Sequence, residues 1–397
     1  MQVPGASPFV AAHLSDLHLS TFGDTFHDRA RIVPRGKDPA LVPDGREPLW
    51  SEHGWRILML GVGKKEHLAL LDPEGYEHPV PKNKGIAATP LGMAVERAQF
   101  LHERRSRTLA AELPGPDRLD RMLAATPKSS NLRLLQAARA LSSDRLDAIF
   151  LTGDVTDDGD GWELCEAVFR KWIDRGRLFV VPGNHDLYLF PLRGSGRPRP
   201  THESKRAAWR AFAARIGLEL DSTGAYYKPL PEADAVLIGL DSCAPPQRRF
   251  FRHNGAIGEA QLAYVERIGR TPEWRTARHR IVLLHHHVVP LPLGVGRRAP
   301  FEIGMRLDDA AATAKLFDEI GVNLVLHGHR HVSESRQPAG SDFQILASPS
   351  FTLGCRSGDR PSYWRIELGE RRHLERTHVA LSAIAADDDP VANYAEQ

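Results

Sequence analysis

The chain has 397 residues, a formal net charge of +2 at pH 7 and a hydrophobic content of 42%. This composition is typical of a folded globular protein, and it excludes a disordered chain or one that binds polyanions by strong positive charge alone. Nucleic acid is therefore permitted as a partner but not indicated. The length suits two average domains, or one large α/β domain with an insertion.

The three cysteines, Cys165, Cys243 and Cys355, are odd in number and far apart. This spacing argues against a disulfide framework and against a thiolate zinc site, so we expect a reducing compartment. The amino terminus has no basic stretch followed by a long apolar one, and no apolar run is long enough to cross a bilayer. These features predict a cytoplasmic protein without membrane contact.

The first predicted strand is the apolar run Phe9–Leu14, which ends in Ser15-Asp16-Leu17-His18. In an extended segment, residues two apart point to the same side, so Asp16 and His18 can hold one ion together. For this short motif by itself, the simpler interpretation is an exposed acidic and basic pair at the end of a strand.

Residues 21–127 separate this strand from the rest of the predicted core, and we interpret them as an insertion. Thr21–Pro48 is rich in Pro, Gly, Asp and Arg and is predicted to loop over the surface. Arg56–Val62 and His67–Leu71 can form a β-hairpin. Leu91–Leu113 is predicted to be helical, with a basic side formed by Arg97, Arg104, Arg105 and Arg107. That side is either a solvated face or a surface for a phosphate-bearing substrate.

A βαβ unit is predicted next. Ser129 or Ser130 can cap a helix whose apolar residues recur at helical spacing, and Asp147–Leu151 is then predicted to be a buried strand. Because a helix precedes this strand, it should lie parallel to Phe9–Leu14. The carboxyl ends of both strands would then lie at the same edge of a sheet.

The second strand is followed by a glycine and several acidic residues. Gly153 lets the backbone turn close to whatever lies there, and the two oxygens of Asp154 can bridge two cations. Asp157 and Asp158 are expected either to support the ligands or to be solvated.

The helix Trp162–Arg175 leads to the apolar strand Leu178–Val181, which ends in Pro-Gly and so gives way to a tight turn. Three polar side chains follow. Asn184 offers a neutral oxygen ligand, His185 an imidazole that can carry a proton near neutral pH, and Asp186 a carboxylate able to orient that imidazole. By itself, a Gly-Asn-His-Asp string is also compatible with an ordinary polar turn.

A basic loop, Arg193–Pro200, follows close to these residues. Three elements are predicted after it: the helix Lys205–Ile216, the strand Ala235–Asp241 and a helix that opens at Gly258. The strand His279–Leu284 then ends in three adjacent histidines. Three neighbours cannot all face one way, so His285, the first to leave the strand, is the natural ligand.

The last predicted ligands follow the helix Leu307–Ile320 and the strand Val322–Leu326. His329 and His331 are two apart, and Gly328 allows another part of the chain to approach closely. A His-x-His directly after a buried strand is a strong signal for a metal.

Five strand ends therefore carry oxygen and nitrogen ligands. We predict seven metal ligands: Asp16, His18, Asp154, Asn184, His285, His329 and His331. In an α/β sheet the carboxyl ends of the strands share one edge, where ligands bind. Seven such ligands with one bridging carboxylate suit two borderline transition ions such as Mn, Fe, Zn, Ni or Co. Paired ions activate a water or hydroxide and clamp the oxygens of an in-line phosphoryl displacement.

In this order, the motifs resemble the complete signature of the calcineurin-like metallophosphoesterases: Asp16-Leu17-His18, Gly153-Asp154, Gly183-Asn184-His185-Asp186, His285 and Gly328-His329-Arg330-His331. The resemblance extends from about Phe9 to Glu367, apart from the stretch Leu19–Pro127. It implies an α/β fold, a four-layer α/β/β/α sandwich of two sheets, with a long insertion after the first strand.

The resemblance also implies a role for each residue. One metal ion would be held by Asp16, His18, Asp154 and His331, and the other by Asp154, Asn184, His285 and His329. His185 would be catalytic without binding metal, either stabilising the phosphoryl oxygen or protonating the leaving group, and Asp186 would orient it. The two ions would be divalent or of mixed valence.

Two departures from the family pattern concern the substrate. The cyclic-nucleotide and glycerophosphodiester phosphodiesterase branch, which the chain resembles, usually has His-His-Pro-Pro where this chain has His285-His286-His287-Val288-Val289-Pro290. The insertion is also longer than that branch would suggest. We expect a metallophosphoesterase domain over residues 1–380, interrupted at 21–127 by a segment that either caps the site or packs on the flank, and a flexible acidic tail at 381–397.

The favoured function is hydrolysis of a small or nucleotide-like phosphoester. A nuclease of the same superfamily is one alternative, and it would need a basic groove, for which the candidates are Arg193, Arg197, Arg199, Arg248, Arg249, Arg252, Arg297 and Arg298. A non-catalytic regulatory protein that binds metal is the other alternative. His185 argues against it, because a purely structural site has no use for an unligated imidazole. The oligomeric state is left open by the sequence.

Overall fold

The structure of the chain is a computed structural model that describes residues 7–21, 47–61, 63, 66–75, 77–78, 80, 89–127, 129–157, 159–189, 201–243, 254–289, 305–353 and 361–379. The predicted loop Arg193–Pro200, the tail 381–397 and most of Thr21–Pro48 lie outside these ranges. Among the described helices, none is long and apolar enough to cross a membrane.

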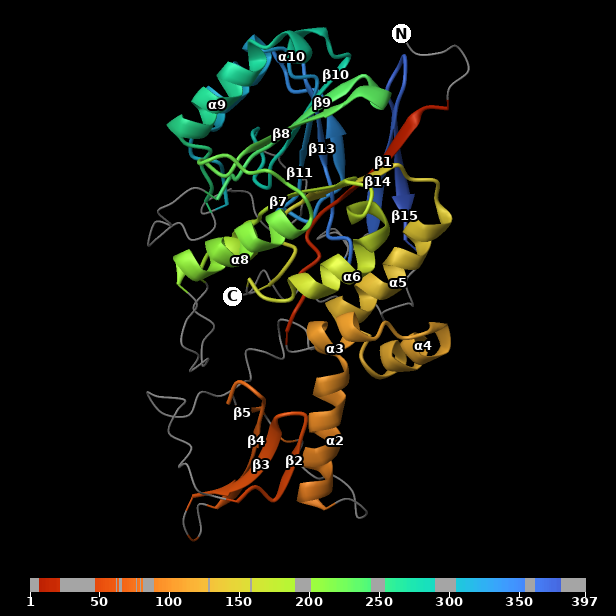
Figure 1. The fold of residues 1–397 in the computed structure, drawn as a ribbon, viewed down its shortest axis with the longest axis vertical. Coiled ribbons are helices and arrows are strands. Elements are labelled where there is room, and N and C mark those ends of the chain that lie inside the picture. Colours follow the sequence, from red (N-terminus) through yellow and green to blue (C-terminus); the bar gives the residue numbers. More distant parts are fainter. Residues whose placement is uncertain are drawn as a thin grey trace.

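A five-stranded sheet contains the first three strands that precede predicted ligands (Figure 1). Its order is β15 (His373–His378), β14 (Ser362–Leu368), β1 (Phe9–Leu14), β6 (Ala148–Thr152) and β7 (Leu178–Val181). β1, β6 and β7 are parallel, whereas β14 is antiparallel to β1 and to β15. The predicted parallel pairing of the first two core strands across the insertion is thereby confirmed, and the residues after β1, β6 and β7 lie at one edge.

The second sheet has six strands, in the order β12 (Glu334–Arg336), β13 (Gln344–Ala347), β11 (Leu324–His327), β10 (His279–Leu283), β9 (Ala235–Gly239) and β8 (Tyr226–Leu230). β9, β10, β11 and β13 are parallel, and β8 and β12 are antiparallel edge strands. A 3-10 turn, η3 (Pro231–Ala233), joins β8 to β9. β10 and β11, which precede the predicted histidine ligands, are neighbours in the centre of this sheet.

Hydrophobic cores on the two faces of the second sheet explain the layers. Along β9, Leu237 belongs to the core shared with the first sheet, while Val236 and Ile238 belong to the core beneath the outer helices. The first core includes residues of α5 (Ser130–Ser143), α6 (Trp162–Ile173) and α8 (His202–Arg215), and the second includes residues of α9 (Glu259–Gly269), α10 (Pro272–Thr276) and α11 (Ala310–Glu319). The predicted α/β/β/α sandwich is confirmed (Figure 1).

The insertion forms a lobe with a sheet and a core of its own, drawn in orange in Figure 1. The lobe consists of the antiparallel strands β2 (Trp50–Glu52), β3 (Trp55–Leu60), β4 (His67–Leu71) and β5 (Glu77–His78) and of α2 (Pro90–Glu103). The insertion continues with α3 (Ser106–Ala111) and α4 (Pro116–Ala125), whose residues Leu109, Leu119 and Leu123 belong to the core of the first sheet. The predicted hairpin is confirmed as β3 and β4. Trp55, Ile57 and Leu70 pack against Ala98 and Leu101 of α2, so the sheet buries one face on its own helix.

One predicted helix is wrong in its extent. Leu91–Leu113 forms two helices, α2 and α3, because the chain is extended at Arg105 (φ −62°, ψ 142°). Arg105 is buried there, and its Nη2 lies 2.5 Å from Glu74 Oε1. A buried guanidinium needs a charged partner, so this long-range ion pair ends a helix that the local pattern would continue. Because Arg104 is buried as well, neither arginine belongs to an exposed basic face.

The two ends of the lobe meet beside β1. The amide of Ser106 donates to the carbonyl of Ser20 at 3.3 Å. The buried side chain of Asn131 accepts from Ser20 N and donates to the carbonyls of Ser20 and Arg104. The Ser106 hydroxyl also donates to Glu163 at the start of α6. The chain between Ser20 and Ser106 therefore leaves and re-enters the core at one point.

Candidate metal centre

The predicted ligands lie in turns of unusual backbone geometry. Seven described residues other than glycine have a positive φ, and five of them are predicted ligands: Asp16 (55°), His18 (51°), Asp154 (49°), His329 (72°) and His331 (49°). This left-handed region costs a residue with a Cβ roughly 1–2 kcal/mol. Such strain persists only where the surrounding structure enforces it, most often at functional sites. The strain is therefore concentrated where the sequence predicts metal ligands.

Two glycines let these turns approach one another. Gly153 has φ +89°, and a Cβ there would lie 2.6 Å from His285 Nδ1 and 2.8 Å from the backbone of Gly183. A Cβ at Gly328 would collide with the carboxylate of Asp16. The close approach predicted at Gly153 and at Gly328 is therefore confirmed.

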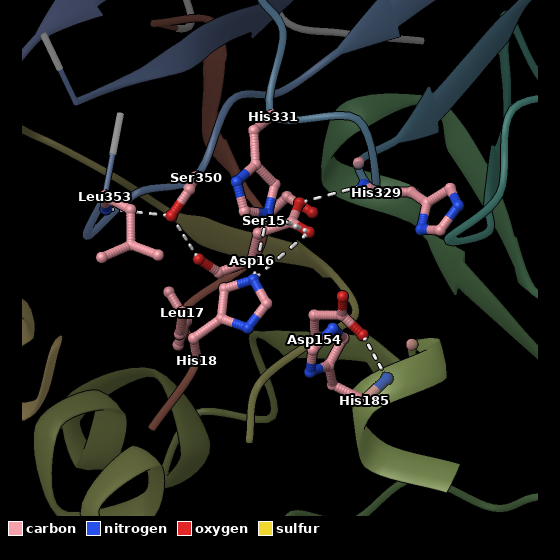
Figure 2. A network of polar contacts seen from close by, with 12 residues as sticks. Ser15, Asp16, Leu17, His18, Asp154, His185, His329, His331, Ser350 and Leu353 are labelled. Carbon is pink, nitrogen blue, oxygen red and sulfur yellow. Dashed lines mark hydrogen bonds and ion pairs between the residues drawn. The ribbon is translucent and has the colours of Figure 1, made fainter. Parts of the chain in front are cut away.

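A first cluster joins the two sheets. His331 Nε2 lies 3.0 Å from His18 Nε2 and 3.3 Å from Asp16 Oδ1, and His18 Nε2 lies 3.9 Å from the same oxygen (Figure 2). All three side chains are buried. Asp16 follows β1 of the first sheet, whereas His331 follows β11 of the second, so two imidazole nitrogens and a carboxylate oxygen converge from opposite sides.

The other nitrogen of His18 fixes the direction of this ring. His18 Nδ1 lies 2.7 Å from Asp157 Oδ1, which favours a proton on Nδ1 and leaves the Nε2 lone pair facing the cluster. Burial opposes a charge on this imidazole, but the carboxylates of Asp157, Asp154 and Asp16 outweigh it and raise the pKa of His18 to about 9. The surroundings of His18 thus favour a positive charge at this place.

A second cluster is built around His285. Its Nε2 lies 2.9 Å from Asn184 Oδ1 and 3.3 Å from Asp154 Oδ2, and a ring nitrogen of His329 lies within 4.8 Å of the ligand atoms of Asp154 and His285. The carbonyl of Thr152, 2.8 Å from His285 Nδ1, directs Nε2 into the cluster. Burial lowers the pKa of His285, but Asp154 and the other acceptors raise it to about 9.

Asp154 belongs to the second cluster and lies close enough to the first for its charge to act on His18. Burial alone would raise its pKa, but the imidazoles of His285, His185 and His18 hold the pKa of this carboxyl well below its usual range. Its Oδ1 also accepts the backbone amide of His185 at 2.8 Å (Figure 2). Because its charge acts on imidazoles of both clusters, Asp154 is the candidate for the bridging ligand that the sequence predicts.

The carboxylate beside His185 is not the predicted one. His185 Nδ1 lies 3.3 Å from Asp157 Oδ1, and the side chain is 14% exposed. Asp186 instead accepts the amides of Thr156 (2.8 Å) and Gly183 (2.9 Å). The reason is local: Asp186 is the third residue of the short helix α7 (Asn184–Leu187), where a carboxylate reaches back to the amide that precedes the helix.

The buried carboxylate and imidazoles fit divalent ions. Asp16 Oδ1 is buried and has no hydrogen-bond partner among the described residues, although two imidazole nitrogens face it. Oxygen and imidazole donors without thiolates suit borderline transition metals. All seven predicted ligands lie in these two clusters, and His185 lies beside them with its ring centroid 4.8 Å from that of His18.

Two further residues support the centre: Asp157, which was expected from the sequence either to support the ligands or to be solvated, and Lys205, which was not identified from the sequence. Asp157 contacts both His18 and His185, and its only signal is its position three residues after Asp154. The buried Lys205 donates from Nζ to the carbonyl of His185 at 2.7 Å, and it lies in a helix whose pattern gives no sign of this role.

Several solved structures are similar to the chain. A purple acid phosphatase from yellow lupin (Lupinus luteus) is 13% identical, with a TM-score of 0.40 over 66% of this chain and 47% of that protein. A putative 5′-nucleotidase from Staphylococcus aureus is 16% identical, with a TM-score of 0.36 over 68% and 53%. The sulfate thiohydrolase SoxB of Thermus thermophilus is 16% identical, with a TM-score of 0.40 over 100% and 60%. The chain thus spans about half of the length of these proteins.

No curated protein matches the chain. The sequence model of one family, described as calcineurin-like phosphoesterase, matches residues 117–333. This range includes Asp154, Asn184, His285, His329 and His331, and β1 places Asp16 and His18 beside them. Because the match covers more than half of the sequence, the chain belongs to the calcineurin-like phosphoesterase family.

Proposed function

We propose that the chain is a dinuclear metal-dependent phosphoesterase that hydrolyses phosphodiester or phosphomonoester bonds in small or nucleotide-like substrates. The observation that carries the proposal is that two buried ligand clusters adjoin, with Asp154 in the second cluster and its charge acting on His18 of the first, and that the imidazole of His185 lies beside His18. The buried free thiols of Cys165 and Cys243 are consistent with action in a reducing compartment such as the cytoplasm.

Each cluster would hold one ion, with Asp154 shared. The first ion would take Asp16, His18 and His331, and the second would take Asn184, His285 and His329. Two divalent ions, when bound, supply Lewis acidity toward a phosphoester and activate water for its displacement. The donor set admits Mn, Fe, Zn, Ni or Co. The protein contributes the fixed directions of the ligands, which Thr152 and Asp157 set from behind the imidazoles.

His185 would act on the substrate rather than on metal. Its Nδ1 faces Asp157, which favours a proton there and orients the ring. Among the described side chains that contact the clusters, that of His185 is the most exposed. Its other nitrogen can therefore reach a substrate oxygen. We assign it the stabilisation of a phosphoryl oxygen or the transfer of a proton to the leaving group.

A nuclease would require a basic groove across the site. All eight arginines proposed for such a groove lie outside the described residues, so no described contact favours this alternative. A regulatory protein that binds metal without catalysis would not need the partly exposed imidazole of His185 paired with a carboxylate.

The experiment is a substrate screen on the chain stripped of metal and then supplied with Mn²⁺. The panel contains bis-p-nitrophenyl phosphate, p-nitrophenyl phosphate, cyclic nucleotides and single-stranded nucleic acid, and Asp154→Ala is the inactive control. We expect Mn-dependent hydrolysis of at least one small ester. Hydrolysis of nucleic acid alone would indicate the nuclease, and two bound ions without any hydrolysis would indicate the regulatory protein.

A further inference from the structure

We propose that Ser350 and Thr352, which follow β13, are positioning residues for the turn that carries Asp16 and His18. They lie beyond the segment that matches the family, and neither was singled out in the sequence. The inference rests on the proposed function, because it concerns how firmly the turn presents its ligands to metal.

The contacts are direct and buried. The Ser350 hydroxyl donates to the carbonyl of Asp16 at 2.6 Å, and the Thr352 hydroxyl donates to the carbonyl of Leu17 at 2.9 Å. Both side chains are fully buried. The Ser350 oxygen in turn accepts the amide of Leu353 at 2.9 Å, which directs its proton toward Asp16 (Figure 2).

A third hydroxyl binds the next carbonyl of the turn. Ser130, at the start of α5, donates from Oγ to the carbonyl of His18 at 2.6 Å. The cap of this helix is a different residue, Ser129, whose hydroxyl accepts the amide of Leu132. Three consecutive carbonyls, from Asp16 to His18, therefore each accept from a separate buried hydroxyl.

The amides of the same turn are bound on the opposite side. Asp16 N donates to the carbonyl of Gly153 at 3.0 Å, and His18 N donates to the carbonyl of Asp154 at 2.9 Å. Buried backbone groups need partners, and here they obtain them from the β6 turn on one side and from hydroxyls on the other. The turn is held from both sides while Asp16 and His18 keep their left-handed backbone.

These hydrogen bonds to the turn matter most before metal is bound. The left-handed backbone at Asp16 and His18 is costly, so without a cation the geometry of the turn depends on these hydrogen bonds. If only a fraction of the metal-free molecules keeps the binding geometry, the apparent dissociation constant rises in inverse proportion to that fraction. The hydroxyls touch the backbone of the turn and not the ligand atoms, so they act by preorganisation.

The test measures Mn²⁺ binding to metal-free protein by isothermal titration calorimetry, together with the melting temperature of the metal-free chain. We expect Ser350→Ala to weaken one of the two Mn²⁺ sites by about 10-fold, since it leaves a buried carbonyl without its donor. Ser348→Ala is the matched control. Ser348 is equally buried in the same segment, but its hydroxyl points to the carbonyl of His13 at 3.3 Å, outside the turn.

A second pair of variants tests the proposal even if Ser350→Ala does not fold. Thr352→Val keeps the shape and removes the hydroxyl, whereas Thr352→Ser keeps the hydroxyl and removes a methyl group. We expect weaker Mn²⁺ binding in the first and affinity near that of the unmodified chain in the second.

The outcomes separate the proposals. Unchanged Mn²⁺ affinity in Ser350→Ala and Thr352→Val, with a lower melting temperature, would overturn the positioning role and leave the dinuclear site standing. Equal weakening in Ser348→Ala would also overturn it, because the effect would then be general loosening. An unmodified chain that binds no Mn²⁺ would overturn the proposed function and this inference together.

Discussion

The insertion lobe and the metal centre bury the same kinds of side chain in different ways. In the lobe, His78 Nε2 lies 2.8 Å from Asp72 Oδ2, and Asp72 Oδ1 accepts the amide of Glu74, so both carboxylate oxygens are bound. In the centre, Asp16 Oδ1 is buried without a hydrogen-bond partner among the described residues while His18 and His331 face it. A buried Asp–His pair is therefore not itself a metal site.

Backbone strain separates the two regions further. The centre contains five of the seven described residues other than glycine that have a positive φ, whereas the lobe contains one, His53 in the β2–β3 turn. A hairpin turn is an ordinary place for such a residue. Convergence of ligand atoms together with strain in several turns is what distinguishes the centre.

The largest effect is expected for Asp154→Ala, which removes the shared carboxylate. We expect the loss of both ions, measured by metal analysis, and a fall in turnover beyond the roughly 10–100-fold typical of residues that only support ligands. Asp72→Ala is the matched variant in the lobe and should retain two ions per chain. Two ions retained in Asp154→Ala would mean that the bridge is assigned wrongly.

His185→Ala should separate catalysis from metal binding. Because no ligand role is assigned to this imidazole, we expect two ions per chain and a turnover lower by about 10²-fold or more. Metal analysis and steady-state kinetics on the same preparation give both values. If an ion is lost as well, His185 belongs to the ligand set.

Asp157→Asn tests the carboxylate that contacts both His18 and His185. The amide keeps the shape but removes the negative charge that orients the two rings, so we expect turnover to fall by roughly 10–100-fold. Metal affinity should fall too, through His18, which distinguishes this variant from His185→Ala. Wild-type kinetics in Asp157→Asn would contradict the role given to Asp157.

Removal of the lobe tests whether it caps the site. Replacing residues 22–103 with a short Gly-Ser linker keeps α3 and α4, and the ends can be joined because Ser20 O and Ser106 N lie 3.3 Å apart. We expect a folded chain that still binds two ions. Lost discrimination among larger phosphoesters would identify the lobe as a cap, and unchanged relative rates would assign it to the flank. A chain that no longer folds would contradict the independence of the lobe.

The smallest effect concerns stability in acid. Burial lowers the pKa of His13 from 6.5 to about 3, although Asp16 opposes this. The unfolded chain therefore binds more protons than the folded chain between these values, so stability falls as the pH drops below 6.5. At pH 5 the loss is about 2 kcal/mol. We measure the free energy of unfolding with urea at pH 7 and at pH 5. Between these pH values it should fall by about 2 kcal/mol less in His13→Gln than in the unmodified chain. Equal falls in the two proteins would contradict a buried, neutral His13.

The sequence by itself determined the structural elements and motifs that depend only on neighbouring residues. The hairpin of β3 and β4, the buried strands and the order of polar motifs at their ends all follow from local periodicity and turn residues. The glycines at 153 and 328 also carried local information, since each permits an approach that a Cβ would block. The seven predicted ligands rest on the same local patterns, because α/β sheets bind ligands at the carboxyl ends of their strands.

The tertiary structure decided what depends on residues far apart in the chain. β1, β6 and β7 belong to one sheet and β10 and β11 to another, so the centre forms where two sheets meet and not along one edge. The ion pair of Arg105 with Glu74 ended a helix whose pattern continues. Asp157, not Asp186, lies beside His185, and Ser350 reaches Asp16 across 334 residues of sequence. No local pattern encodes such contacts, because they exist only once both sheets have packed.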